Sequence, residues 1–424
     1  MAHPYASSQR MIKPIGGRSR PAVLRVLLET QFGLFFAGNG LSLIGSWMQR
    51  IACGWLVWEW TASAFWLGVL AAGDLLPVLV TGPFAGVAAD RWDRLKQNRV
   101  AQLASAAVAM TLAALLFLEC LDLVWLVVLV TKQGTLVAAI QPARLAMVQQ
   151  MVAREDMGVA VALNSVSVNL ARLIGPAVAG AMILKLDIYW LFVLNALVTL
   201  IFVWVLGRLQ LLPRTSVPSS DGFWRQMLAG FDYVANNRAI MLVLLALLVG
   251  GAFVRSILEL VPAVAALTFD NTAVGLAALT AASATGAVGA AVTVRRQKVA
   301  SIPVGVLIWW GIGALSALLL TQADNTIVAI LCAVTLGASI TRCLVGTQTF
   351  VQLTTPDGLR GRTLSVHGLI ARGSPALGAL AIGAAADRYD LPSTVLVTSI
   401  VMLVLVLVML GPTRRYASQA AEAD

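Results

Sequence analysis

Residues 65–94 read FWLGVLAAGDLLPVLVTGPFAGVAADRWDR. The first 25 residues of this stretch carry one charged side chain, Asp74, and a cluster of charges then begins at Asp90. About 20 largely apolar residues are enough for a helix to cross the hydrocarbon core of a bilayer. The stretch therefore predicts a transmembrane helix that ends in a charged loop at the membrane surface.

The composition of the rest of the chain agrees with a membrane environment. The 424 residues are 59% hydrophobic and only 12% charged, whereas a soluble domain carries about 25% charged residues because its surface faces water. Most of the surface of this chain is therefore expected to face lipid. The length allows a dozen spans with short connections and leaves no room for a separate catalytic domain.

Further apolar runs of spanning length occur on both sides of a polar stretch. The predicted spans lie near residues 32–58, 65–89, 98–118, 123–145, 157–184, 187–207, 239–262, 273–294, 301–321, 326–350, 360–386 and 392–412. This spacing predicts an all-α integral membrane protein of about twelve transmembrane helices, six before the polar stretch and six after it.

The distribution of Lys and Arg predicts the orientation, because these residues accumulate in cytoplasmic loops. With both termini in the cytoplasm, 22 of the 30 basic residues fall in loops on that side, and only Lys185 and Arg388 fall outside. The net charge of +10 is thus explained by topology, and no nucleic-acid partner is expected. We expect a multi-pass protein of the bacterial inner membrane.

The same reading divides the chain into five parts. They are an N-terminal tail (1–31), a six-helix bundle (32–210), a linker (211–238), a second six-helix bundle (239–412) and a C-terminal tail (413–424). In the linker, apolar residues recur at helical spacing: Phe223, Trp224, Met227, Leu228, Phe231 and Val234. They predict an amphipathic helix, which either lies on the cytoplasmic leaflet or packs against the bundles.

An internal repeat supports two related halves. Ser165, Ala171 and Arg172 match Ser365, Ala371 and Arg372 two hundred residues later, and Gly175-Pro176 has a near counterpart in Ser374-Pro375. The offset equals six predicted helices. Duplication of a six-helix unit is typical of transporters that bind substrate between their halves, near the middle of the bilayer.

The loop after the second span resembles the signature loop of the major facilitator superfamily. It reads Gly86-Val-Ala-Ala-Asp90-Arg91-Trp-Asp93-Arg94, with Asp93 where many members have Gly. The resemblance implies two pseudo-symmetric six-helix bundles. It also implies that Gly86, Asp90, Arg91 and Arg94 form a conformational latch with Arg144 at the end of the fourth span. The alternative is a solvated loop whose charges only fix topology.

Other motifs resemble one bacterial branch of that superfamily, which includes enterobactin-exporter-like and macrolide-efflux-like permeases. The motifs are Gly45-Ser-Trp-Met-Gln-Arg50-Ile-Ala, Pro142-Ala-Arg144, Ala162-Leu-Asn164-Ser165, Ala171-Arg172, Gly175-Pro176 and Arg360-Gly361-Arg362. The resemblance implies proton-driven antiport that exports a small molecule, a monomer in the lipid bilayer, and no cofactor beyond the proton motive force.

The fifth span also resembles the antiporter motif of the superfamily through Gly175, Pro176 and Gly180. Small residues let helices pack closely in lipid, and Pro removes a backbone hydrogen bond. The eighth span offers a matching surface: Gly275, Ala278, Ala282, Gly286 and Gly289. These residues predict a tight seam that closes the outer side, with generic helix packing as the alternative.

Charged residues within the predicted spans are candidate cavity residues, because buried charge in a membrane is costly and usually faces a partner or a cavity. The basic candidates are Arg50, Lys132, Arg172, Arg255, Arg342 and Arg372. Only two deep acids, Asp74 and Glu259, oppose them, which predicts a cavity that prefers anions. Arg172 and Arg342 alternatively snorkel towards the cytoplasmic surface.

Asp74 and Glu259 are the candidate proton carriers, and His367, which can titrate near neutrality, is a further substrate-cavity candidate. A deep carboxyl is protonated or ionised according to burial and nearby cations. The alternatives are structural: a pair of Asp74 with Arg50 or Lys132, a pair of Glu259 with Arg255 four residues away, and a packing role for His367.

The chain contains no HExxH, GxSxG or P-loop sequence, so no enzyme activity is predicted. The sequence predicts a proton-coupled exporter of an amphipathic, anionic small molecule such as a siderophore. A multidrug or macrolide efflux permease, a lysolipid flippase and a membrane scaffold are the alternatives.

Overall fold

The computed structural model describes residues 21–148, 150–211, 223–293 and 298–423. This part of the chain is helical and contains no strand. The first half comprises α1 (Ala22–Glu29), α2 (Gln31–Thr61), α3 (Ala64–Leu75), α4 (Pro77–Arg91), α5 (Arg94–Phe117), α6 (Leu123–Val148), α7 (Met157–Ile183) and α8 (Tyr189–Arg208). Helix α9 (Phe223–Asn236) connects it to the second half.

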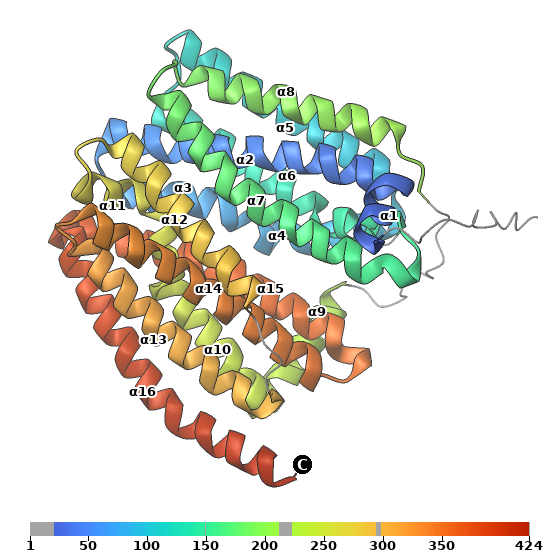
Figure 1. The fold of residues 1–424 in the computed structure, drawn as a ribbon, viewed down its shortest axis with the longest axis vertical. Helices are drawn as coiled ribbons and strands as arrows, with labels where there is room; N and C mark the ends of the chain where they lie inside the picture. Colours follow the sequence, from blue (N-terminus) through green and yellow to red (C-terminus); the bar gives the residue numbers. More distant parts are fainter. Residues whose placement is uncertain (1–20, 149, 212–222, 294–297, 424) are drawn as a thin grey trace, which may run out of the picture.

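The second half comprises α10 (Arg238–Phe253), a 3₁₀ segment (Arg255–Glu259), α11 (Val261–Thr268), α12 (Thr272–Val292), α13 (Ile302–Thr321), α14 (Thr326–Thr354), α15 (Asp357–Tyr389) and α16 (Leu391–Ala423). Figure 1 shows the two halves as separate groups of helices that meet where α3, α11 and α12 begin and lie apart towards α1 and α9. We call these two ends of the molecule the α11 end and the α1 end.

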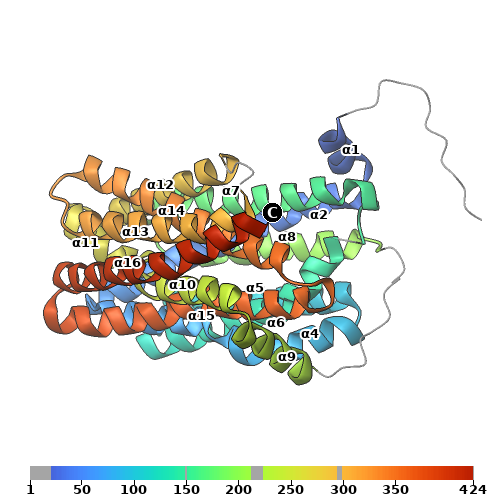
Figure 2. The same cartoon turned by 90° about the horizontal axis from the view of Figure 1, so that it is seen from below.

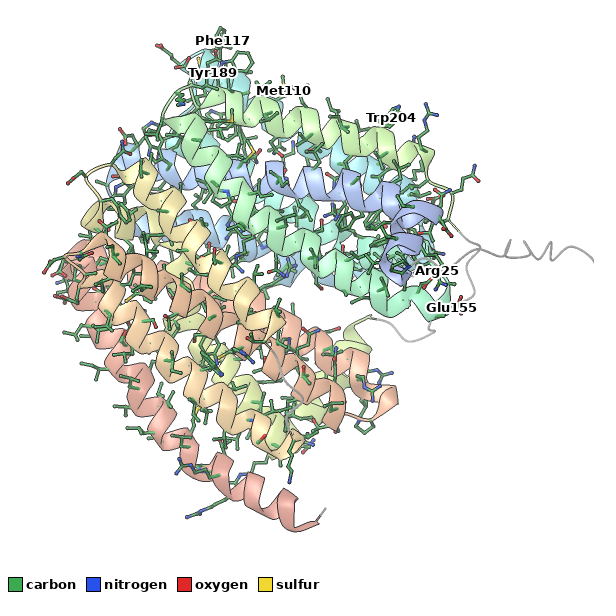
Figure 3. The ribbon with its side chains drawn as sticks, viewed as in Figure 1. Arg25, Met110, Phe117, Glu155, Tyr189 and Trp204 are labelled. Atoms are coloured by element: carbon green, nitrogen blue, oxygen red, sulfur yellow. The ribbon has the colours of Figure 1, made fainter. Side chains whose placement is uncertain are left out.

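Eleven helical segments of the described chain are long and apolar enough to cross a membrane. Helix α2 is long enough as well, but Asn39, Gln49 and Arg50 lower its hydropathy. Counting α2 (Gln31–Thr61), the described residues give the twelve spans expected, most of them close to their predicted bounds. Large apolar side chains such as Trp204 and Met110 are about half exposed on the outside (Figure 3), as expected for a surface that faces hydrocarbon.

Two of the twelve spans are broken helices. The second span divides into α3 and α4 at Pro77, which has no backbone N–H to donate to the preceding turn. The seventh span changes from α10 into the 3₁₀ segment and then into α11, which has Pro262 in its first turn. The segment long and apolar enough to span is Arg238–Glu259, close to the predicted bound of 262, and the helical segments continue through α11 to Thr268.

Helix α9 falls where the amphipathic linker helix was predicted. At Gly230 it approaches α15 so closely that an added Cβ would lie 2.9 Å from the carbonyl oxygen of Arg362, so α9 packs against the second half. Leu228 and Phe231 are nevertheless exposed. The side chains of Phe223, Trp224 and Met227 lie outside the described residues. Figure 2 shows α1 and α9 towards the same end of the molecule.

Helix α1 is joined to the start of α7 by an ion pair. The Arg25 guanidinium donates to the Asp156 carboxylate at 2.5 Å, while Val26 is buried against the bundle. The hydrogen bond and the charge of Asp156 raise the pKa of Arg25 above its ordinary value. Figure 3 shows Arg25 beside Glu155 at this end.

We expect Asp156→Asn to release α1 and to speed its amide hydrogen exchange, with no measurable change in the melting temperature of the protein. The reason is that the Arg25 side chain is 43% exposed although Asp156 is buried, so water screens the pair and limits its contribution to global stability. Hydrogen-exchange mass spectrometry of residues 22–29 would measure the effect. Glu155→Gln is the matched control, and equal exchange in the two variants would contradict this role of Asp156.

Candidate functional site

A cavity of about 490 Å³ lies between the two halves, which is within the size range of small-molecule sites. Residues of α2, α3, α4, α6, α7, α11, α12, α15 and the 3₁₀ segment line it. Its charged lining residues are Arg50, Asp74, Arg144, Arg172, Arg255, Glu259 and Arg372. Helices far apart in the sequence thus bring most of the predicted deep charges to one place.

Arg50 lies at the centre of these charges and bonds both deep acids. Its Nη1 is 2.5 Å from an oxygen of Asp74 on α3, and its Nη2 is 2.5 Å from an oxygen of Glu259 in the second half. One guanidinium carries two such bonds because its donors form a planar fork. The Asp74–Arg50 pair was one of the alternatives predicted. The second bond joins the two halves of the molecule.

Close helix contacts hold Asp74 and Arg50 in place. At Gly134, α6 approaches α3 so closely that an added Cβ would lie 2.9 Å from the Cα of Asp74. On α2, the buried Gln49 accepts a hydrogen bond of 2.7 Å from Asn195 of α8. This bond fixes the rotation of α2 next to Arg50. Uncharged residues thus hold both charged side chains in position: Gly134 beside Asp74, and the Gln49–Asn195 hydrogen bond beside Arg50.

The other arginines of the cavity have different surroundings. Arg255 donates to the backbone carbonyl of Ala371, and Glu259 bonds Arg50, so the predicted Arg255–Glu259 pair is wrong. Arg172 lines the cavity rather than snorkelling to the surface, and its guanidinium lies 5.4 Å from the centre of the Trp47 ring. Arg50 contacts the same ring at 5.5 Å.

Three predicted cavity residues lie elsewhere. Lys132 is exposed on α6, while its neighbour Gln133 lines the cavity. Arg342 donates to the backbone and hydroxyl oxygens of Thr293, at 3.0 and 2.7 Å. His367 is buried, with its Nε2 2.9 Å from the hydroxyl of Thr347. The expectation that these three line the cavity is therefore corrected, and His367 has the packing role that was the alternative.

Arg144 is a charged cavity residue that was not among the predicted cavity candidates. Arg144 was expected only as a latch partner, but it lines the cavity and its guanidinium lies 5.8 Å from the centre of the Phe202 ring. Its position within a span was the available signal. The side chains of Asp90 and Arg91 lie outside the described residues, so the latch stays a prediction. Asp93 caps α5 by accepting from the Lys96 N–H at 2.9 Å.

The predicted seam on α7 reaches the second half at Gly180, whereas Gly175 packs within the first half. An added Cβ on Gly180 would collide with the Cβ of Ala277 on α12, and one on Gly175 would lie 2.5 Å from the Cβ of Trp47. On α12, Gly275 instead faces Phe269, and Gly286 faces the backbone of Val334. The α7–α12 contact therefore uses alanines of α12 and lies near the α11 end.

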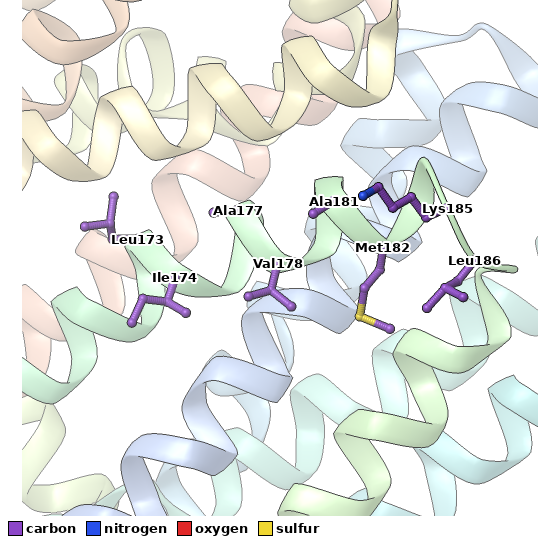
Figure 4. A pocket seen from close by; sticks show the side chains of 8 residues that line it. All are labelled: Leu173, Ile174, Ala177, Val178, Ala181, Met182, Lys185 and Leu186. Carbon is purple, nitrogen blue, oxygen red and sulfur yellow. The ribbon is translucent and has the colours of Figure 1, made fainter.

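A second hollow, of about 610 Å³, runs along the outside of α7 (Figure 4). All of its lining residues belong to α7 and the turn after it, and Lys185 is the single charged one: Leu173, Ile174, Ala177, Val178, Ala181, Met182, Lys185 and Leu186. A groove of one apolar helix face offers few polar groups to fix the orientation of a ligand. The candidate site is therefore the cavity between the halves.

The twelve-helix fold and the charged cavity between its halves define a multi-pass membrane transporter. The chain belongs to the transmembrane secretion effector family of the major facilitator superfamily, whose model matches residues 23–423. Helical membrane transporters of this superfamily are not enzymes, in agreement with the prediction from sequence motifs.

Three curated proteins show what the chain is similar to in sequence, and the chain spans less than two thirds of the length of two of them. The chain is 27% identical to the multidrug efflux pump Tap of Mycolicibacterium fortuitum, over 87% of this chain and 90% of that protein. Its match to the staphyloferrin A transporter of Staphylococcus aureus is 28% identical and covers 35% of this chain and 38% of that transporter. Its match to macrolide efflux protein A of Streptococcus pyogenes is 27% identical and covers 51% of this chain and 54% of the relative.

Solved structures show the same fold at low sequence identity. A bacterial homologue of the human lysosomal transporter Spinster, in an inward-facing and unoccupied conformation, gives a TM-score of 0.70 at 14% identity over 95% of this chain and 98% of its own. A D-xylose–proton symporter gives 0.66 at 15% identity, over 92% of this chain and 96% of its own.

Proposed function

We propose that this protein is a proton-coupled antiporter that exports an amphipathic, anionic small molecule, with siderophores as the first substrate class. The excess of arginine in the cavity carries the proposal. Five guanidinium groups and two carboxylates line it; both carboxylates bond the same guanidinium, that of Arg50. A net positive cavity attracts anions, and the Trp47 ring offers an apolar surface for the rest of the substrate.

The geometry around Arg50 suggests how export would be coupled to protons. Asp74 and Glu259 are the two carboxylates that line the cavity, and both bond Arg50. Antiport requires that the protein carry either the substrate or the protons across the membrane, and not both together. We therefore assign proton binding to these two carboxylates in the substrate-free protein.

We also propose the membrane orientation. With the α1 end in the cytoplasm, the cavity residues nearest that end, such as Arg144 and Asn164, are the first that a cytoplasmic substrate meets. The close contacts at the α11 end then correspond to a conformation closed to the outside. We place the protein in the bacterial inner membrane as a monomer, with the two bundles at residues 32–210 and 239–412.

A macrolide or multidrug efflux permease is the second candidate, because relatives with those names match this chain. The two candidates differ in the charge of the substrate. A cavity with three more cations than anions disfavours a cationic drug. A lysolipid flippase shares the anionic preference but requires a substrate with a long acyl chain.

A thermal-shift screen of the detergent-purified protein tests the proposal. A ligand at about 100 times its dissociation constant stabilises a fold by about 2.7 kcal/mol. We expect catecholate or carboxylate siderophores to raise the melting temperature, and Arg372→Ala to reduce that rise. Stabilisation by neutral macrolides or lysolipids alone would contradict the anionic-metabolite proposal. Uptake of the stabilising compound into inverted vesicles, driven by an imposed pH gradient, then tests proton coupling.

A further inference from the structure

The start of α3 and the end of α15 meet at the α11 end through one carboxylate. Asp387 of α15 accepts hydrogen bonds from the Ala64 N–H at 2.8 Å, the Phe65 N–H at 3.3 Å and the Ser63 hydroxyl. The first N–H groups of a helix have no partner within the helix, and the positive end of its dipole favours an anion. Asp387 of one half therefore caps a helix of the other half.

The backbones of these two helices touch along the same line. An added Cβ on Gly68 of α3 would lie 2.6 Å from the carbonyl oxygen of Ala379, and one on Gly383 of α15 would lie 2.7 Å from the carbonyl carbon of Ala64. Contact at this distance requires that the two halves be closed at the α11 end. The bonds to Asp387 are thus made in one arrangement of the halves and broken when this end opens.

The sequence around Asp387 repeats the loop after the second span. Residues 383–390 read GAAADRYD and residues 86–93 read GVAADRWD, so six of the eight positions are identical and a seventh is aromatic in both. The last Asp of each copy has the same role in the structure. Asp93 caps α5 through Lys96, and Asp390 caps α16 through the Ser393 N–H at 2.7 Å.

The two copies lie at opposite ends of the molecule. The second copy ends α15 at the α11 end, where α3 begins, so the first copy, which ends α4, lies towards the α1 end, where α15 begins. A protein that closes its two ends in turn has one conformation closed at the α1 end and another closed at the α11 end. Two copies of one sequence, one at each end, fit a stabilising contact for each of these conformations.

We propose that Asp387 is the latch that holds the α11 end closed, and that residues 383–388 are the counterpart of residues 86–91 at the opposite end. The inference rests on the proposed transporter function in one respect: a transporter must open the α11 end during its cycle. A charge that caps α3 across the halves stabilises one conformation and contributes nothing to the other. Its removal therefore shifts the equilibrium towards the conformation open at the α11 end.

The test measures the distance between the halves and requires no substrate. Trp60 and Tyr389 are exposed residues on the two sides of the latch, and each is replaced by a spin-labelled Cys in a protein whose exposed Cys120 is Ser. Pulsed electron paramagnetic resonance of this pair in nanodiscs gives the populations of short and long distances. We expect Asp387→Asn to raise the ratio of long to short about threefold or more, and Asp387→Ala to raise it further.

Asp390→Asn is the matched control. Asp390 lies three residues after Asp387 and carries the same charge, but it caps α16, a helix of its own half. We expect this variant to leave the distance distribution unchanged. The latch is refuted if Asp387→Ala leaves the distribution unchanged, or if Asp390→Asn shifts it equally. Failure of the export proposal has a different signature: no tested anion stabilises the protein, while the distance shift of Asp387→Asn persists.

Discussion

Replacing Arg50 with Ala is expected to abolish transport and to lower the free energy of unfolding by about 2–3 kcal/mol. Removing one partner of a buried ion pair costs about 3–5 kcal/mol, and the figure is reduced here because the Arg50 side chain is 32% exposed. The loss leaves Asp74 and Glu259 facing each other without the cation that holds both. Thermal unfolding in detergent and transport in proteoliposomes measure the two effects.

A rescue variant separates the structural effect from the functional one. In Arg50→Leu with Asp74→Asn and Glu259→Gln, no uncompensated charge remains at the centre of the cavity, so we expect the stability to recover while transport stays absent. Lys132→Ala is the matched control, since it removes a basic residue of the spans that is exposed on α6. Transport by the rescue variant at the wild-type rate would show that the triad has no part in the cycle.

The positions of the spans were predictable, because each requires a long apolar run and polar residues are expelled from it. The angular position of a residue on its helix was not. A span buried in lipid on one side and in protein on the other is apolar all round, so hydrophobic periodicity does not mark the inner face. For this reason Lys132 was assigned to the cavity, whereas Gln133, one residue further on, lines it.

The wrong Arg255–Glu259 pair has a specific physical cause. Residues four apart share a face of an α-helix, but residues 255–259 form a 3₁₀ segment. With three residues per turn, positions four apart point in different directions. Glu259 is therefore free to reach across to Arg50. Pro262 and Gly250-Gly251 flank this break and were the signals that the seventh span is not one regular helix.

The sequence could place a charge near the cavity where that charge had few possible environments. Arg50, Asp74, Arg172 and Glu259 are deep charges, and a cavity between the halves is the one environment that accommodates them together. Partners across the halves were not predictable, because contacts between distant segments depend on the packing of whole helices. Asp387 illustrates this: it lies one residue past the predicted span of residues 360–386, and it caps α3 of the other half, a contact that no pattern in the sequence marks.

Replacing Gly68 with Val is expected to prevent closure of the α11 end and to reduce transport by more than tenfold. An added Cβ lies 2.6 Å from the carbonyl oxygen and 2.9 Å from the carbonyl carbon of Ala379, and neither backbone atom moves without displacing α15. Overpacking of this kind costs about 1–3 kcal/mol. Because the clash exists only in the closed conformation, it destabilises that conformation alone. The equilibrium between the two conformations therefore moves towards the open one by a factor of about ten. The labels at Trp60 and Tyr389 measure that shift, alongside transport in proteoliposomes.

Gly289→Val is the matched control, because an added Cβ on Gly289 of α12 meets no atom within 4 Å. We expect its transport and its distance distribution to equal those of the parent protein. Gly68→Val and Asp387→Ala open the same end for different reasons, one by steric exclusion and the other by loss of an attraction. Once the backbones are held apart, Asp387 no longer reaches α3, so the double variant is expected to shift the equilibrium little more than Gly68→Val alone. Additive shifts would mean that the glycine contact and the carboxylate cap act on separate motions.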